Sequence, residues 1–248
     1  MYQFFVEDTQ VGENSVTIEG SDVNHIRNVL RMKRGEKVRI STSSGKNYFG
    51  EIEEFSDAMV LVTIVEECAD GTELANKIYL FQGLPKSDKM ELIIQKAVEL
   101  GAYEIIPVAM KNCVVKLDEK KAGSKVARWQ EIAKSAAKQS KRSLIPTVQM
   151  PMSYKEAVET ASALDVVLVP YENERGMVAT REAIEAITPG QSIGIFIGPE
   201  GGFADSEIAL AREKQMQLIS LGKRILRTET AGLATLSILM YHLEANEV

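Results

Sequence analysis

The chain has 248 residues, of which 45% are hydrophobic and 26% are charged, and its formal net charge is -6. This composition is that of an ordinary globular protein with enough apolar material for a buried core. No uninterrupted apolar run approaches the roughly 18 residues that a membrane-spanning helix needs, and residues 1–8 lack the pattern of a secretory signal. We therefore expect a soluble protein that acts in the cytoplasm.

The two cysteines, Cys68 and Cys113, lie far apart in no spacing that is typical of a metal or redox site. We expect two reduced, mostly buried thiols. No metal is expected to bind.

Charge is segregated along the chain. Residues 24–39 carry six Lys or Arg against one acidic residue, and residues 111–142 carry ten against three. These local charges of +5 and +7 leave -18 for the remaining 200 residues. The pattern favours two basic surfaces that could hold phosphates on an acidic body. Solvated faces of ordinary helices are the alternative.

The N-terminal part of the chain predicts a small β-barrel. Three β-rich segments, 38–41, 48–52 and 59–65, are separated by turn-forming residues such as 43–47. One helix interrupts the strands, and its apolar residues recur at helical spacing. These are Val23, Ile26, Val29 and Leu30, after a cap at Ser21 or Asp22, with Arg27, Arg31 and Arg34 left for solvent or a ligand.

The polar stretch 69–76 predicts a boundary between a domain at 1–70 and a domain at 76–248. Beyond it, apolar strands alternate with longer helices, which indicates an α/β fold. The predicted strands are 78–81, 105–108, 166–169, 193–197 and 218–221. Their nearly continuous apolarity is typical of parallel strands that are covered on both faces.

Two helices of this α/β part follow from apolar periodicity. The first ends at Gly101 and buries Met90, Ile93, Ile94, Ala97 and Val98. The second, 124–142, places Val126, Trp129, Ala133, Ala136 and Ala137 on one face, with Lys134, Lys138, Lys141 and Arg142 largely outside it. Trp129 at this spacing is more typical of core packing than of base stacking.

A glycine-rich loop, 198–202, follows the strand 193–197 directly. Glycines there let a ligand approach the backbone closely, and ligands of open α/β sheets bind beyond the carboxyl ends of the strands. Because Phe203 and Ala204 follow, the loop is not a Walker A phosphate loop. Turn chemistry alone would explain such a loop equally well.

A second loop, 221–230, leads from the last strand into a helix at 231–240. The two loops could form opposite walls of one pocket. Arg227 and Glu229 point the same way on an extended segment, so they could bind or activate a polar substrate. The alternative is a surface ion pair with Thr228 and Thr230 capping the helix.

These two loops, 197–203 and 221–231, resemble the signature of the RsmE family, the 16S rRNA uridine-N3 methyltransferases of the knotted SPOUT class. The similarity extends to further blocks along the chain, namely 25–31, 83–91, 99–101, 128–129 and 136–140. The resemblance implies a PUA-like RNA-binding barrel, an α/β domain tied in a trefoil knot, and a homodimer. It also implies S-adenosylmethionine as methyl donor and uridine 1498 of 16S rRNA, in the small ribosomal subunit, as substrate.

The resemblance also implies site residues. The donor would be held mainly by backbone groups, with Arg227 facing the reacting centre. The donor-binding residues are Pro170, Tyr171, Phe196, Ile197, Gly198, Pro199, Glu200, Gly201, Leu221, Gly222, Ile225, Leu226 and Arg227. Because uracil N3 carries a proton at neutral pH, we expect Arg227 to stabilise the uridine anion, and Glu229 either to orient Arg227 or to accept the proton.

We expect RNA contacts from the two basic segments and their neighbours. The candidates are His25, Arg27, Arg31, Lys86, Lys138, Gln139, Ser140 and Arg142. His25 fits a structural role equally well. The chain departs from the family where Lys111 and Asn112 replace an acidic residue and an arginine, and where Gln3 replaces a basic residue.

Three other readings stay open. The first is a non-catalytic RNA-binding or ribosome-assembly factor, and the second is a SPOUT enzyme that modifies a different nucleotide. The third is a small-molecule enzyme with a phosphate loop, which leaves the basic helix unexplained.

Overall fold

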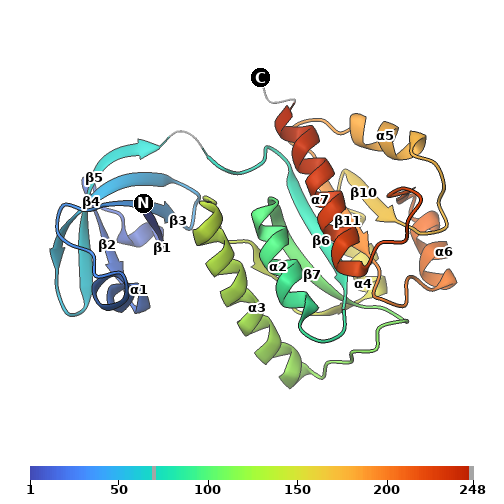
Figure 1. Cartoon of the computed structure of the whole chain (residues 1–248), viewed down its shortest axis with the longest axis horizontal. Coiled ribbons are helices and arrows are strands. Elements are labelled where there is room, and N and C mark those ends of the chain that lie inside the picture. The colour runs from blue at the N-terminus through green and yellow to red at the C-terminus, as the bar shows by residue number, and fades with distance from the viewer. Residues whose placement is uncertain (69–70, 246–248) are drawn as a thin grey trace. The chain divides into compact units, whose positions relative to one another are not determined.

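A computed structural model describes residues 1–68 and 71–245, and its chain divides into two compact units (Figure 1). The first unit comprises Met1–Glu73 and Ala137–Ile145, and the second comprises Leu74–Ala136 and Pro146–Val248. Of the predicted domain ends, residues 69–70 and 246–248 lie outside the described residues. The two-domain division at 1–70 and 76–248, the trefoil knot and the homodimer stay predictions.

The first unit is built on a curled five-stranded sheet, counted over its described residues, in the order β1-β3-β4-β5-β2. The strands are β1 (Tyr2–Val6), β2 (Ser15–Glu19), β3 (Lys37–Thr42), β4 (Asn47–Phe55) and β5 (Met59–Cys68). Strands β1 and β3 run parallel, and the other pairs are antiparallel. The predicted small barrel and its three predicted strands are confirmed, while β1 and β2 were not predicted.

Alternation along these strands builds the core of the first unit. On β3, Val38 and Ile40 are fully buried, and on β5 Val60 and Val62 are fully buried on the same inward face. β-branched residues pack well on such a pleated surface, so their spacing of two fixes which face turns inward.

The helix of the first unit differs from the prediction. It consists of α1 (Ser21–Asn24), followed by a π-helical turn, η2 (His25–Val29), in which Leu30 N–H donates to the His25 carbonyl. Val23 and Ile26 are buried as predicted, but Val29 is 64% exposed. The wider π turn rotates Val29 away from the core, so its predicted place on the apolar face is wrong. A short 3₁₀ turn, η1 (Asp8–Gln10), precedes β2.

The second unit contains a parallel sheet, seven-stranded over the described residues, in the order β12-β10-β11-β6-β7-β8, with β9 also paired to β7. Its strands are β6 (Lys77–Gly83), β7 (Ala102–Ala109), β8 (Thr147–Val148), β9 (Met152–Ser153), β10 (Val166–Pro170), β11 (Ser192–Ile197) and β12 (Gln217–Ile219). Parallel pairing of the predicted strands is confirmed. Strands β8 and β9 were not predicted.

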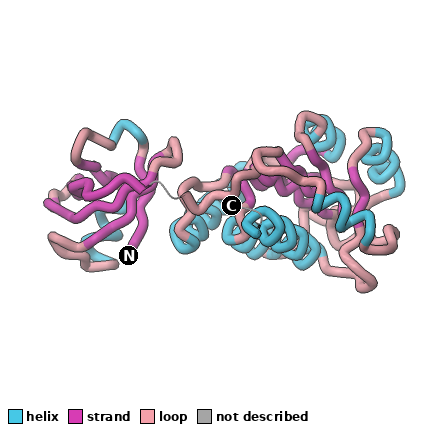
Figure 2. Tube along the Cα trace, turned by 90° about the horizontal axis from the view of Figure 1, so that it is seen from above, coloured by secondary structure: helices cyan, strands magenta, loops and turns pink. Residues whose placement is uncertain are grey.

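Helices lie on both faces of this sheet (Figure 2). They are α2 (Lys89–Glu99), α3 (Glu119–Ser140), α4 (Tyr154–Ala161), α5 (Val178–Glu185), α6 (Asp205–Glu213) and α7 (Thr228–Ala245). The predicted stripe of α2 is buried throughout, and Trp129 of α3 is a core residue. Helix α3 begins five residues before the predicted start at 124 and ends two before 142, and α7 begins at Thr228 rather than at 231.

The strand order explains where a site can form. Neighbouring strands β12, β10, β11 and β6 all run parallel, so their carboxyl ends lie at one edge of the sheet. The segments that leave this edge begin at 171, 198, 220 and 84. Ligands of open α/β sheets bind at such an edge.

Both cysteines are free and half-buried. Burial raises the pKa of the Cys113 thiol. No helix among the described residues is long and apolar enough to cross a membrane, and these residues contain no cluster of side chains suited to a metal.

Candidate functional site

A cavity of about 370 Å³ lies at the carboxyl edge of the parallel sheet in the second unit. Its walls come from the loops after β10, β11 and β12 and from the start of α7. The lining residues are Lys89, Pro170, Tyr171, Glu172, Glu174, Ile197, Gly198, Pro199, Glu200, Gly202, Phe203, Ser220, Leu221, Gly222, Lys223, Arg224, Ile225, Leu226, Arg227, Thr228 and Ala231. The two glycine-containing loops thus border one cavity.

Most of the predicted donor-binding residues line this cavity, including the exposed Arg227, but two of them do not. Phe196 is fully buried and stacks on Phe81 with ring centroids 4.4 Å apart. Strand β11 is buried on both faces from Ile193 to Ile197, which explains this place in the core. Gly201 turns instead toward Asn112, with the position of a Cβ only 2.9 Å from the Asn112 Cβ.

The glycine turn is held from behind by the segment that follows β7. The Asn112 side-chain amide donates to the carbonyls of Gly201 and Gly202 at 3.1 and 3.2 Å. The buried Glu207 carboxylate accepts the backbone N–H groups of Lys111 and Ala204, each at 2.8 Å. Asn112, one of the two residues at which the chain departs from the family pattern, thus contacts the glycine turn through its side-chain amide.

A buried hydrogen-bond relay joins the two loops. Gln82 Nε2 donates to Thr228 Oγ1 at 2.8 Å, and Thr228 Oγ1 donates to the Gly198 carbonyl at 2.7 Å. Gln82 is fully buried and Thr228 is 5% exposed. Since buried polar groups keep their partners, this relay fixes the first residue of α7 against the glycine turn.

Lys89 is a residue of the cavity that the sequence reasoning missed. Its Nζ lies 3.0 Å from Glu200 Oε1 and 3.1 Å from Glu229 Oε2. No ion pair joins Glu229 to Arg227 among the residues that the structure describes, so the alternative of such a pair is not what is seen there. The only sequence signal was the place of Lys89 in the block 83–91.

The two carboxylates raise the pKa of Lys89, Glu200 most strongly. Burial works to raise the pKa of Glu200, but hydrogen bonds from Lys89 and from backbone N–H groups outweigh burial and lower it. Lys89 and Glu200 are thus both charged at neutral pH.

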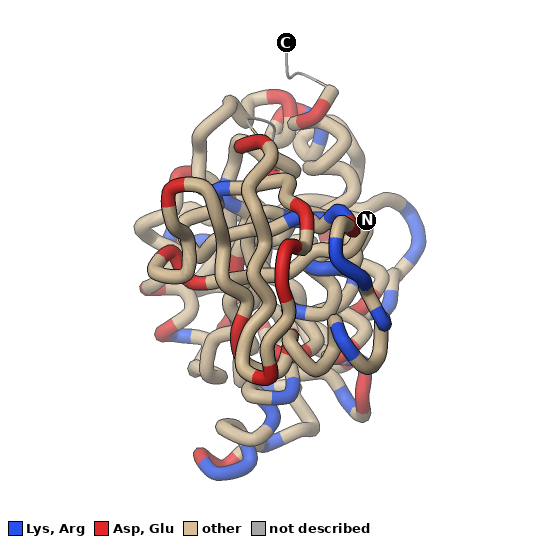
Figure 3. The backbone as a smooth tube through the Cα atoms, turned by 90° about the vertical axis from the view of Figure 1, so that its left-hand side faces the viewer, with Lys and Arg blue, Asp and Glu red and all other residues tan. Residues whose placement is uncertain are grey.

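Several of the residues predicted to bind RNA are already paired with carboxylates of the first unit. Arg142 is 4% exposed, and its guanidinium pairs with Glu73 within the first unit. Lys138 Nζ lies 2.8 Å from Asp22, and Arg27 lies 3.1 Å from Asp57. In Figure 3 a stretch of basic residues runs beside the N-terminus, whereas acidic residues are spread over other strands.

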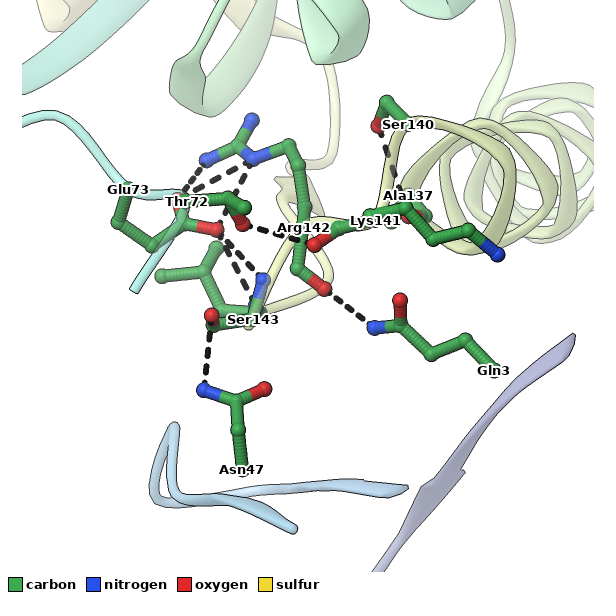
Figure 4. Close-up of polar contacts among 10 residues, drawn as sticks. Gln3, Asn47, Thr72, Glu73, Ala137, Ser140, Lys141, Arg142 and Ser143 are labelled. Atoms are coloured by element: carbon green, nitrogen blue, oxygen red, sulfur yellow. Dashed lines mark hydrogen bonds and ion pairs between the residues drawn. The ribbon is translucent and has the colours of Figure 1, made fainter. Parts of the chain in front are cut away.

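Figure 4 shows the surroundings of Arg142, which we name the barrel polar cluster: Gln3, Asn47, Glu73, Arg142 and Ser143. Gln3 Nε2 donates to the Arg142 carbonyl at 2.6 Å, and Asn47 Nδ2 donates to Ser143 Oγ at 2.9 Å. Glu73 also accepts the Ser143 N–H at 2.8 Å. Gln3, which stands where the family has a basic residue, thus uses its side-chain amide for a hydrogen bond within the first unit.

The remaining RNA candidates are more accessible. His25, Arg31, Lys86 and Gln139 are exposed. Ser140 Oγ lies 3.5 Å from the Ala137 carbonyl. The four exposed side chains have no ion pair with any residue that the structure describes, so they can reach a ligand without breaking one.

Comparisons with known proteins give the same assignment for both parts of the chain. The model of an RNA methyltransferase domain matches residues 72–240, and the model of an RNA methyltransferase PUA domain matches residues 18–63. Ribosomal RNA small subunit methyltransferase E of Bacillus subtilis is 39% identical over 250 residues, which cover 98% of each chain.

Solved structures are similar over almost the whole chain. A ribosomal RNA small subunit methyltransferase E from Neisseria gonorrhoeae, bound to S-adenosyl methionine, has a TM-score of 0.81 at 31% identity, covering 96% of this chain and 95% of the other. A methyltransferase of Legionella pneumophila in complex with the same cofactor has a TM-score of 0.81 at 30% identity, covering 96% of each. The PUA-like barrel and the SPOUT α/β fold are thereby confirmed, and this chain belongs to the RsmE family of RNA methyltransferases.

Proposed function

We propose that this protein transfers a methyl group from S-adenosylmethionine to 16S rRNA of the small ribosomal subunit, at N3 of the uridine equivalent to position 1498. The observation that carries the proposal is the cavity bordered by both glycine-containing loops. Relatives with the same fold hold S-adenosylmethionine. N3 as the acceptor atom and the uridine position come from the family resemblance.

The cavity fits this donor. Its volume of about 370 Å³ is within the range of small-molecule sites. Gly198 and Gly202 allow backbone groups to approach a ligand. Glu172, which lines the cavity and has no ion pair among the described residues, supplies negative charge for a cationic donor. The donor would supply an activated methyl group on a sulfonium, so the protein needs no metal for the transfer.

The protein must stabilise the negative charge that forms on the acceptor base. Uracil N3 must lose its proton, and the resulting negative charge spreads to the neighbouring carbonyl oxygens. Arg227 is exposed and lines the cavity, so its guanidinium would stabilise that charge. Glu229, two residues further and in the first turn of α7, would either accept the proton or orient Arg227.

RNA would be held by the barrel and by exposed cations. We assign the RNA-binding domain to 1–70 and the methyltransferase domain to 76–248. His25, Arg31, Lys86 and Gln139 are the accessible candidates for RNA contacts. A homodimer in the cytoplasm is part of the same proposal.

The test is incubation of small ribosomal subunits with the enzyme and labelled S-adenosylmethionine, followed by nucleoside analysis. Labelled 3-methyluridine is the expected product, and label on N1 of a purine or on a ribose hydroxyl would contradict the proposed acceptor. Calorimetry measures donor binding separately, and an absence of binding would overturn the donor assignment.

Arg227→Ala tests the assignment of the reacting centre. We expect kcat to fall by about 100-fold or more, because a charge contact to the developing anion is lost, while donor affinity stays within about threefold. The matched control is Arg181→Ala on α5. The Arg181 side chain is 67% exposed, and we expect this variant to keep wild-type activity. An active Arg227→Ala enzyme would rule out this role.

A further inference from the structure

Lys89 joins two parts of the site that are far apart in sequence. Its ammonium lies 3.0 Å from Glu200, in the turn after β11, and 3.1 Å from Glu229, in the first turn of α7. The residue lines the cavity and is the first residue of α2. One cation therefore bridges the glycine turn and the start of the helix that follows Arg227.

The loop from β6 to α2 is shaped to place this cation. Gly83 packs so closely that a Cβ there would lie 2.7 Å from the Pro199 nitrogen. Ser87 has a φ of +56°, in the left-handed region that a serine rarely adopts. The Lys86 N–H donates to both Glu200 oxygens, at 3.1 and 3.3 Å. The loop thus holds the Glu200 carboxylate from two directions.

Charge explains why the bridge is needed. Without the Lys89 ammonium, the carboxylates of Glu200 and Glu229 would repel each other, and their partial burial would strengthen that repulsion. The side chains of Lys89, Glu200 and Glu229 are 26%, 24% and 18% exposed. The Glu229 oxygen that faces Lys89 is buried and has no aligned hydrogen-bond partner, so without the ammonium it would be left with no counter-charge.

Lys89 is not suited to take the uracil proton itself. Both carboxylates raise its pKa, so the side chain carries its proton at neutral pH. Any effect of Lys89 on methyl transfer must therefore come from the positions in which it holds Glu200 and Glu229.

We propose that Lys89 is a positioning residue of the methyl-transfer site, whose shared ammonium keeps the donor-binding turn and the start of α7 at a fixed separation. This inference rests on the proposed function. It predicts that loss of Lys89 displaces Glu229 and the neighbouring Arg227 segment more than it disturbs Glu200, because the Lys86 N–H still holds Glu200.

The experiment compares the wild type with Lys89→Met, Lys89→Arg and the control Lys96→Met. Lys96 lies on the same helix and pairs only locally with Glu99 at 2.8 Å among the contacts of the described residues. For each protein, kcat and KM are measured with small ribosomal subunits, donor Kd by calorimetry, and amide hydrogen exchange of segments 198–203 and 227–231 without donor.

For Lys89→Met we expect kcat to fall about 100-fold, as for a misplaced catalytic group, with KM for RNA unchanged and donor Kd raised by about threefold. Lys89→Arg keeps the charge and should recover most of kcat, and Lys96→Met should match the wild type. Wild-type kcat in Lys89→Met, or no recovery in Lys89→Arg with an intact fold, would overturn the proposal.

Hydrogen exchange separates failure of this inference from failure of the proposed function. If the wild type methylates no rRNA, the proposed function fails, yet the bridge is still tested. Faster exchange at 227–231 in Lys89→Met, reversed in Lys89→Arg, supports the bridge. Equal exchange in all four proteins contradicts it.

Discussion

The donor cavity and the barrel polar cluster both contain basic and acidic side chains, but the two regions pair them differently. In the barrel polar cluster, Arg142 and Glu73 form an ion pair in which the arginine is 4% exposed. In the cavity, Arg227 is exposed while Lys89 is shared between two carboxylates. The first arrangement is closed to ligands, whereas the second leaves a cation facing a space large enough to bind one.

The difference shows that partners, rather than charge alone, decide whether a cation can bind a ligand. A buried arginine that loses its carboxylate leaves an uncompensated charge, so it stabilises only when paired. An exposed arginine at the edge of a cavity loses little by changing from water to a ligand. Substitutions in the two regions should therefore affect different measurements.

The largest effect is expected from Arg142→Met. Breaking the pair with Glu73 should lower the free energy of unfolding by about 3 kcal/mol, because the partly buried carboxylate loses its counter-charge and keeps only backbone N–H donors. Urea unfolding followed by circular dichroism measures the loss. The control is Arg128→Met, whose pair with Glu91 is 65% exposed on the arginine side and should matter by about 0.5 kcal/mol at most. Equal losses in the two variants would erase the distinction between the regions.

Gly201→Ala should act on donor binding instead. The new Cβ would lie 2.9 Å from the Asn112 Cβ and 3.1 Å from its carbonyl oxygen, so the turn must shift. We expect the donor Kd to rise by about tenfold or more, the effect of roughly 1.4 kcal/mol. Gly123→Ala in α3 meets no atom within 4 Å and should leave Kd unchanged. Calorimetry with both variants checks this.

A smaller effect distinguishes exposed from paired cations in the first unit. Arg31 is exposed and has no ion pair among the described residues, whereas Lys138 lies 2.8 Å from Asp22. Arg31→Gln should weaken RNA binding and reduce the slope of log K against log salt by about one. Lys138→Gln should leave that slope unchanged. The reverse result would show that the Lys138 pair opens on RNA binding.

The smallest expected effect is on stability at low pH, and it concerns the exposed carboxylate of Asp8. Hydrogen bonds from Ser44, Ser43 and Thr42 lower the pKa of Asp8 to about 2. A carboxylate with a lowered pKa stabilises the folded state above its ordinary pKa of about 4 and loses that effect as pH falls through the folded value. Unfolding midpoints between pH 5 and 2 should thus fall less for Asp8→Asn than for the wild type. A parallel fall would exclude Asp8 as a contributor.

Much of the fold could be predicted because apolar periodicity directly reflects burial. The stripe on α2 follows from it, and the strands β10 and β11 follow from continuous apolar runs that are buried on both faces. Val29 could not be placed, since an inserted π turn changes the helical period without a sequence signal. Strand β8 was missed because a two-residue strand has too little pattern.

The candidate site was predictable where glycine and strand ends coincide, as at Gly198 and Gly222. The supporting residues were not, because their roles depend on contacts across long sequence separations. Gln82 and Thr228 are 146 residues apart, and Lys89 meets Glu229 only through the strand order. A count of cations likewise could not reveal that Arg142 is paired with Glu73.

The discontinuous make-up of the first unit bears on the order of events during protein synthesis. Its sheet is complete at Cys68, but segment 137–145, which supplies Arg142 and Ser143, follows much later. While a nascent chain is between these points, Gln3 and Asn47 lack two of their native acceptors. The barrel should therefore reach its final stability only after the first part of the second unit, residues 74–136, has already left the ribosome.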